Sequence, residues 1–95
     1  MFIVSLTYTC ELTEIDSYLD EHVAFLKKHY GLQHFLVSGR KVPRSGGIIL
    51  ANVESLAQLH SILEEDPFHR EKLAEYAVQE FEPTMAAEGL ESYFM

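Results

Sequence analysis

The apolar positions of the chain indicate first a short strand and then a helix. Residues 2–8 form a short segment rich in β-branched and aromatic side chains, which indicates a strand. Between residues 15 and 30, apolar positions recur every three or four residues, which predicts a helix with an inward-facing stripe. The stripe consists of Ile15, Leu19, Val23, Leu26 and Tyr30, with Tyr18, His22 and Phe25 beside it.

Capping residues set the expected ends of this helix. Thr13-Glu14-Ile15-Asp16 has the spacing of a capping box, in which a hydroxyl accepts from one amide and an acid reaches back to another. Gly31 follows the last apolar position and fits a left-handed C-cap. We therefore expect a continuous helix from Thr13 to about Tyr30.

The middle of the chain reads as a hairpin. Residues 34–41 are expected to form a second strand and residues 47–53 a third. Between them, residues 42–47 contain Pro43, Ser45, Gly46 and Gly47, which is typical of a turn.

The remaining elements are a helix, a short helix and a strand. Ser55-Leu56-Ala57-Gln58 is a second capping-box pattern and opens the helix. Asp66 is expected to end it, because Pro67 disfavours helical geometry in the residue before it. Asp66 can then cap a short helix over residues 68–73 with Pro67 at its first position. Residues 75–82 read as the last strand, and residues 83–95 as a tail.

The order strand, helix, strand, strand, helix, strand (βαββαβ) is the split βαβ arrangement of an α+β, ferredoxin-like domain. We expect a four-stranded antiparallel sheet with both helices on one face, in a single domain over residues 1–95. Both alternating sets of strand positions are apolar, so we expect a second copy of the chain to cover the other face, giving a homodimer. The apolar end Tyr93-Phe94-Met95 is a candidate to pack across the same dimer.

Composition excludes several classes of partner. The chain has 95 residues and a net charge of −8, which argues against binding nucleic acid or an anionic membrane surface. No apolar run approaches the roughly 20 residues of a membrane span. Cys10 is the only cysteine, so an intrachain disulfide is excluded and a cytoplasmic location is expected.

His22 is the most informative polar residue, because it lies beside the apolar stripe of the first helix. It is either a hydrogen-bonded core histidine or a general acid and base tuned by a carboxylate. Asp66 is the natural carboxylate, although its place before Pro67 is also explained by capping. The split βαβ topology brings the end of the second helix close to the first turns of the first helix, so Asp66 can approach His22.

Other polar groups are expected at the same edge of the sheet. Ser38, Gly39 and Arg40 close the second strand there, and Tyr8 closes the first. The only basic cluster is Arg40, Lys41 and Arg44. It is either a solvated turn or the rim of a pocket for a small anion.

Metal and cofactor chemistry have no sequence signature. The remaining histidines show no recognised zinc-ligand spacing, and no cofactor motif is present. Cys10 lies too far along the chain from His22 to pair with it, at roughly 13–14 Å of helix rise.

These residues together resemble the YciI-like (YCII-related) family of small α/β proteins. The resemblance rests on Asp20-Glu21-His22-Val23, on Ser38-Gly39-Arg40, on the strand Gly46-Gly47-Ile48-Ile49-Leu50, and on Ser55 opening a helix that ends Glu65-Asp66-Pro67-Phe68. It implies a dimeric α+β barrel relationship and an active site of His22 and Asp66, with Ser38 as a third polar member. Many members have proline where this chain has Arg40, so the rim of the pocket can differ.

The resemblance implies a cofactor-independent enzyme that uses His22 and Asp66 for acid–base chemistry in a lyase, isomerase or hydrolase step. Ser38 or an amide near Gly39 would bind a developing oxyanion. Arg40 or Arg44 would hold a substrate carboxylate or phenolate, with Tyr8 and Phe68 as further substrate contacts. The alternative is a non-catalytic dimeric module that binds a small ligand or a partner in the same pocket.

Overall fold

The computed structural model describes all 95 residues and contains four strands and five helices. In chain order these are β1 (Phe2–Tyr8), α1 (Leu12–Ser17), α2 (Leu19–Gly31), β2 (Phe35–Arg40), β3 (Gly46–Ala51), α3 (Leu56–Leu63), α4 (Pro67–Arg70), β4 (Ala74–Glu80) and α5 (Glu91–Phe94).

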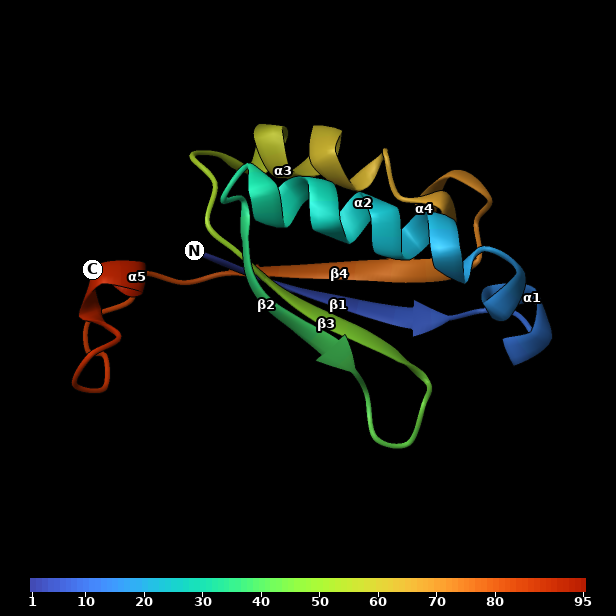
Figure 1. Ribbon diagram of the computed structural model, residues 1–95, viewed down its shortest axis with the longest axis horizontal. Coiled ribbons are helices and arrows are strands. Elements are labelled where there is room, and N and C mark those ends of the chain that lie inside the picture. The colour runs from blue at the N-terminus through green and yellow to red at the C-terminus, as the bar shows by residue number, and fades with distance from the viewer.

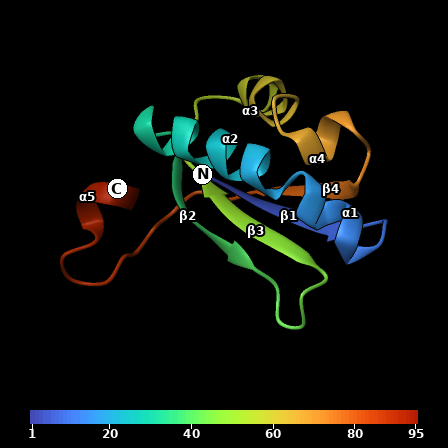
Figure 2. The ribbon, with the colours of Figure 1, turned by 45° about the vertical axis from the view of Figure 1, so that its right-hand side comes forward.

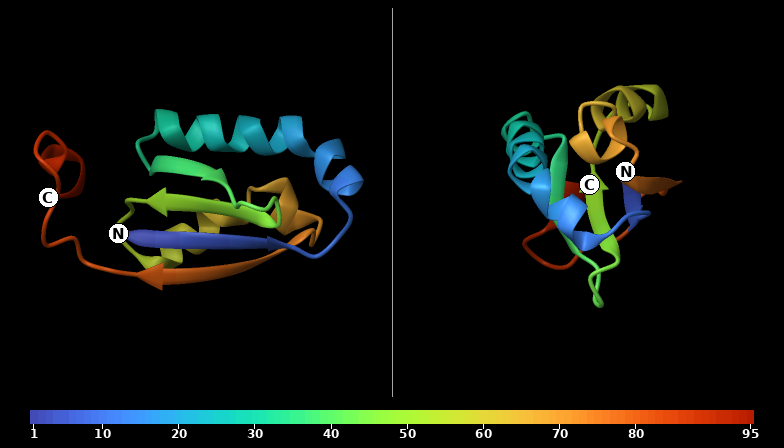
Figure 3. Two further views of the ribbon diagram at one scale, coloured as in Figure 1. Left: turned by 90° about the horizontal axis from the view of Figure 1, so that it is seen from below. Right: turned by 90° about the vertical axis from the view of Figure 1, so that its right-hand side faces the viewer.

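The four strands form one antiparallel sheet in the order β2-β3-β1-β4. Helices α2, α3 and α4 lie over one face of this sheet, as Figure 1 shows, and the view from below in Figure 3 shows the strands side by side. The expected α+β, ferredoxin-like architecture is confirmed.

The hydrophobic core lies between the sheet and the helices. Alternate residues of β1 are buried because side chains of a strand point to opposite faces. Phe2, Val4 and Leu6 face the helices and pack with side chains from β3, α3 and α4. The other members of the core are Ile15, Phe25, Phe35, Ile49, Ala51, Leu59, Ile62, Leu63, Phe68 and Leu73.

The opposite face of the sheet carries exposed apolar side chains. Ile3, Val37 and Ile48 are 39%, 57% and 39% exposed, and Leu50 is half-buried between Ile3 and Val37 in the strand register. This agrees with the expectation that both alternating sets of strand positions are apolar.

A β-bulge in β2 changes which side chains face the helices. Phe35 is opposite Ala51, but Val37 is opposite Leu50, so the register shifts by one residue between them. Without the shift, Ser38 would lie on the face opposite to Phe35. The bulge therefore turns Ser38 and Arg40 toward the helix layer.

The expected single helix over residues 13–30 is wrong, because the chain breaks at Tyr18 into α1 and α2. The Ser17 hydroxyl donates to the Glu14 carbonyl, and the Tyr18 amide bonds to Ile15 instead, one residue closer than in an α-helix. The expected capping box at Thr13 is also wrong, since Glu11 precedes α1 and no side chain caps it.

The expected left-handed cap at Gly31 is wrong as well. Gly31 ends α2, and the left-handed residue is Gln33, with φ of 63°. The His34 amide bonds to the His29 carbonyl and the Gln33 amide to the Tyr30 carbonyl, which is a Schellman motif. This motif brings the side chains of His29 and His34 together.

The caps predicted for the later helices are confirmed. The Ser55 hydroxyl accepts from the Gln58 amide, and the Asp66 carboxylate accepts from the Phe68 amide with Pro67 at the first helical position. Helix α4 is shorter than expected and ends at Arg70.

The C-terminal segment extends from the end of β4 away from the helices, and its last residues form the short helix α5, as Figures 1 and 2 show. Its side chains Met85, Tyr93 and Met95 are exposed. No helix of the chain has the length and apolar character needed to cross a membrane.

Candidate active site

The imidazole of His22 and the carboxylate of Asp66 meet at the junction of α2 with the α3–α4 turn. His22 Nδ1 lies 2.8 Å from Asp66 Oδ1. The carboxylate is fully buried, whereas 13% of the His22 side chain is exposed. His22 Nε2 makes no hydrogen bond within the chain, whereas every buried side-chain nitrogen or oxygen does. Nε2 is therefore not buried and is open to solvent.

Asp66 holds its position through two further hydrogen bonds. The Phe68 amide donates to Oδ1 at 3.1 Å, and the Tyr76 hydroxyl donates to Oδ2. The local sequence produces this geometry, because an aspartate before Pro67 caps α4 with the side-chain oxygen that also faces α2.

Phe68 forms a platform for the imidazole. Its ring stacks on His22 with centroids 4.1 Å apart and planes 12° from parallel, and it contacts Tyr8 edge to face. Phe68 is 1% exposed, so the platform is part of the core. One face of the His22 ring is thus covered, which limits its movement.

A cavity of about 280 Å³ opens beside the imidazole. Seven of the eight residues expected at the site line it: Tyr8, His22, Ser38, Gly39, Arg40, Arg44 and Phe68. Asp66 lies behind His22. The other lining residues are Leu6, Leu19, Val23, Leu26, Gly46, Gly47, Ile48 and Ile49.

Much of the predicted core stripe of the first helix is instead the wall of this cavity. Leu19 and Val23 line it and are each 37% exposed, and Tyr30 is 36% exposed. The residues of α2 that are fully buried are Phe25 and His29. The face of α2 that packs on the core is therefore rotated from the stripe that apolar spacing indicates.

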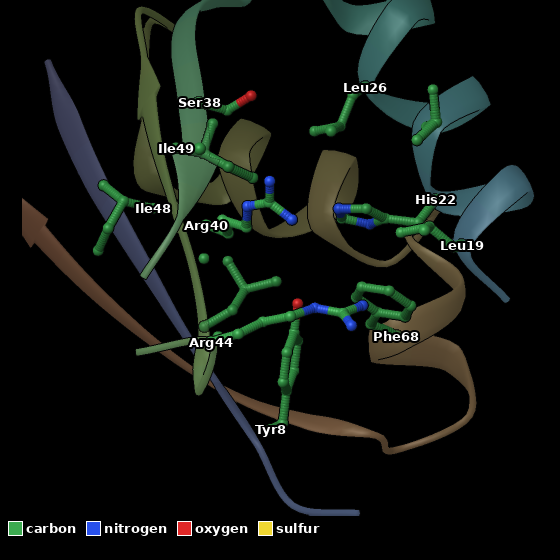
Figure 4. A pocket seen from close by; sticks show the side chains of 15 residues that line it. Tyr8, Leu19, His22, Leu26, Ser38, Arg40, Arg44, Ile48, Ile49 and Phe68 are labelled. Atoms are coloured by element: carbon green, nitrogen blue, oxygen red, sulfur yellow. The ribbon is translucent and has the colours of Figure 1, made fainter. Parts of the chain in front are cut away.

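Two guanidinium groups approach the cavity from the wall opposite His22, as Figure 4 shows. Arg40 has no hydrogen-bond or ion-pair partner within the chain, although it lines the cavity. Arg44 ion-pairs with Asp16 of α1, and this hydrogen bond raises the pKa of Arg44 above its ordinary value. Arg44 thus ties the β2–β3 loop to α1 across the cavity mouth.

The hydroxyl of Ser38 is hydrogen-bonded to the hydroxyl of Tyr30. Tyr30 lies on α2, two turns after His22, so the pair connects β2 with the helix that carries the imidazole. Ser38 lines the same cavity as His22 and Arg40.

Sequence reasoning missed a second histidine–carboxylate pair. His29 is 2% exposed, and its Nε2 lies 3.0 Å from Glu65 Oε1 while its Nδ1 lies 2.9 Å from His34 Nδ1. Hydrogen bonds from Lys28 and His29 hold the pKa of Glu65 below its ordinary value. A signal for this pair was available in the sequence. His22 and His29 are seven residues apart on one helix face, and their partners Asp66 and Glu65 are consecutive acids.

Sequence reasoning also missed Tyr76. It faces the helices because it pairs with the buried Leu6 in the β1–β4 register. Tyr76 alternates with Ala74 and Val78 on the side of β4 that faces the helices, which indicated burial. The pattern did not indicate which residue its hydroxyl would contact.

Cys10 lies apart from this site. Its thiol donates to the Leu73 carbonyl at 3.6 Å, and burial with the nearby Glu14 raises its pKa. No group of three or more His, Cys, Asp or Glu side chains is arranged to hold a metal ion.

A family model described as "YCII-related domain" matches residues 1–82. Among solved structures, the fold is similar to that of a 5-chloro-2-hydroxyhydroquinone dehydrochlorinase from Burkholderia phenoliruptrix AC1100 in complex with 2,5-dihydroxybenzoquinone. The match has a TM-score of 0.72 and 19% sequence identity, and covers 85% of this chain and 93% of that one. No curated protein matches the chain.

Proposed function

Because the chain belongs to the YCII-related domain family, we propose that it is an enzyme that performs acid–base chemistry on a small anionic molecule. The observation that carries the proposal is the His22–Asp66 pair. Asp66 is fully buried behind the imidazole, and the nitrogen that faces away from Asp66 opens on a cavity.

In this proposal His22 Nε2 takes a proton from the substrate and returns it at another atom or to the leaving group. Asp66 accepts from Nδ1, holds the ring in one orientation and stabilises the imidazolium that forms. The stack on Phe68 keeps the ring plane fixed. Each group therefore acts at a position that the fold has already set, which reduces the reorganisation needed during reaction.

The cations opposite His22 support an anionic substrate. Arg40 has no partner in the chain, and a guanidinium presents a planar fork that suits a carboxylate or phenolate. Arg44, which also pairs with Asp16, and the Ser38 hydroxyl, which also bonds to Tyr30, would take further substrate oxygens, with the backbone near Gly39 beside them. The aromatic rings of Tyr8 and Phe68 form one side of the cavity, which suits a planar substrate.

The dehydrochlorinase supports the enzymatic proposal, since it is similar in fold and its structure holds 2,5-dihydroxybenzoquinone, a planar ring with ionisable oxygens. A lyase, isomerase or hydrolase step is compatible with a single proton-transferring imidazole. The rival function is a non-catalytic module that binds a small ligand in the same cavity.

The homodimer is part of the proposal. Ile3, Val37 and Ile48 expose an apolar patch on the uncovered face of the sheet, which a second copy would bury. Sedimentation analysis of Val37→Lys tests this, with Leu56→Lys, an exposed apolar residue on α3, as the matched control. Loss of the dimer in the first variant alone is expected, and a monomeric wild type contradicts it.

The function is tested with a panel of small carboxylates, phenols and hydroxyquinones, including 5-chloro-2-hydroxyhydroquinone. Thermal shift detects binding, and time-resolved proton NMR detects conversion. We expect conversion by the wild type and by His60→Gln, whose histidine is exposed and far from the cavity, but not by His22→Gln. Binding without conversion of any bound compound supports the ligand-binding rival.

A further inference from the structure

The hydroxyl of Tyr76 makes a contact that the proposed proton transfer leaves unexplained. It comes from β4 on the far side of Asp66 from His22 and donates to Oδ2. Asp66 is fully buried, so no solvent molecule can replace this donor without entering the core. The carboxylate is therefore held between a phenol on one oxygen and an imidazole on the other.

The environment of Tyr76 fixes the direction of this hydrogen bond. Burial and the negative charge of Asp66 raise the pKa of Tyr76 well above its ordinary value. The phenol consequently keeps its proton and acts as the donor. The other titratable groups around the pair are Tyr8 on β1, Glu21 on α2, His69 against the Tyr76 ring, and Arg70, which pairs with Glu21.

The donors around Asp66 determine the proton position on His22. The Phe68 amide and the Tyr76 hydroxyl can only donate here, so both carboxylate oxygens act as acceptors. An ionised carboxylate only accepts hydrogen bonds, so its contact with His22 at Oδ1 is made when the proton lies on Nδ1. The neutral imidazole then has its lone pair on Nε2, the nitrogen that is open to the cavity.

We propose that Tyr76 is a positioning residue that keeps Asp66 an acceptor and so holds His22 in the Nδ1–H tautomer. Without the phenol, Oδ2 would be a buried acceptor with no donor. The carboxyl group would then turn toward another donor or bind a proton itself, and a protonated carboxyl can donate to Nδ1. A carboxyl that donates to Nδ1 places the imidazole proton on Nε2. A carboxylate that turns away no longer holds the proton on Nδ1, so the Nε2–H tautomer gains population and the lone pair at the cavity is lost in that fraction. The role of this tautomer in proton transfer rests on the proposed function. The hydrogen bonds that hold the tautomer do not depend on it.

The test is nitrogen-15 NMR of the histidine rings in alkaline buffer, where imidazoles are neutral. In the wild type, His22 should be almost entirely the Nδ1–H tautomer. In Tyr76→Phe, the ratio of Nδ1–H to Nε2–H should fall by about tenfold or more, the effect of losing one hydrogen bond to an ionised group. Tyr93→Phe, which removes an exposed hydroxyl, is the matched control and should leave the ratio unchanged.

A second measurement covers the case in which Tyr76→Phe does not fold. In the wild type, the Tyr76 hydroxyl proton should exchange slowly enough to give a resolved downfield signal. An unchanged tautomer ratio in folded Tyr76→Phe, or a fast-exchanging Tyr76 hydroxyl in the wild type, overturns the inference. Neither readout needs a substrate, so a protein that shows both expected signals but converts nothing would refute the proposed function alone.

Discussion

The imidazole of His22 lies 2.8 Å from the carboxylate of Asp66, although 44 positions separate them in the chain. The contact forms because α3 runs back over the sheet and ends beside the start of α2. One residue thus does two tasks, since Asp66 caps α4 through Phe68 and holds the imidazole with the same oxygen. Stability and the proposed chemistry are coupled at this carboxylate.

Asp66→Ala should therefore destabilise the protein by about 2–4 kcal/mol, from a lost cap and two buried donors without an acceptor. Urea unfolding measures the change in the free energy of unfolding. Asp20→Ala removes an exposed acid of α2 that makes no side-chain hydrogen bond, and should change it by less than about 0.5 kcal/mol. Equal effects of the two substitutions would refute a special role for the buried carboxylate.

Gly46 is required by close backbone packing on the floor of the cavity. A Cβ atom added there would lie 1.7 Å from the Leu6 carbonyl oxygen, whereas one added at Gly39 meets nothing within 4 Å. Gly46→Ala should lower the free energy of unfolding by about 3 kcal/mol or shift β1 from β3. Gly39→Ala is the control and should be close to neutral, and a neutral Gly46→Ala would show that the strands can separate freely.

Glu65 should make stability depend on acidic pH. Hydrogen bonds from Lys28 and then His29 hold its pKa below the unfolded value of about 4.3. A carboxyl whose pKa is lowered by folding stabilises the protein above the unfolded value and loses that contribution as pH falls through the folded value. Thermal unfolding of Glu65→Gln should thus vary less with pH below about 4.3 than wild type.

Glu64→Gln is the matched control for this effect, since Glu64 is an exposed neighbour with no ion pair. Its melting temperature should follow the wild-type pH dependence. If Glu64→Gln and Glu65→Gln flatten the curve equally, the ion pairs of Glu65 are not the cause.

The Cys10 thiol should react slowly with alkylating reagents near neutral pH. Burial and Glu14 raise its pKa, so little of the nucleophilic thiolate is present. Iodoacetamide labelling followed by mass spectrometry should be several-fold slower than for a free cysteine. Glu14→Gln should accelerate it and Glu88→Gln, a change in the distant tail, should not; no acceleration in Glu14→Gln would contradict the contribution of Glu14.

Most of the fold followed from the sequence because its strands and later helices have strong local signals. Ser55 and Asp66 cap helices as predicted, since a short polar side chain before a helix satisfies its first amides. The break at Tyr18 was not predicted, because it depends on the Ser17 hydroxyl competing for the Glu14 carbonyl. Apolar periodicity continues across the break and conceals it.

Contacts of the candidate site that depend on the order of strands and helices could be predicted from the sequence. Contacts that depend on strand register could not. The approach of Asp66 to His22 follows from strand and helix order alone. That Ser38 and Arg40 share the cavity with His22 depends on the bulge between Phe35 and Val37, which leaves no clear pattern in an all-apolar segment. The hydrogen bond from the Tyr76 hydroxyl to Asp66 depends on tertiary packing, which the spacing of residues along β4 does not indicate.

The proposed binding of a small anion between Arg40 and the free nitrogen of His22 can be measured directly. Nitrogen-15 NMR during titration with 2,5-dihydroxybenzoquinone follows the His22 and Arg40 side chains together. We predict saturable shifts of His22 Nε2 and of the Arg40 guanidinium, with none in Arg40→Gln. Binding that leaves the His22 Nε2 signal unmoved, or no binding at all, would contradict the account.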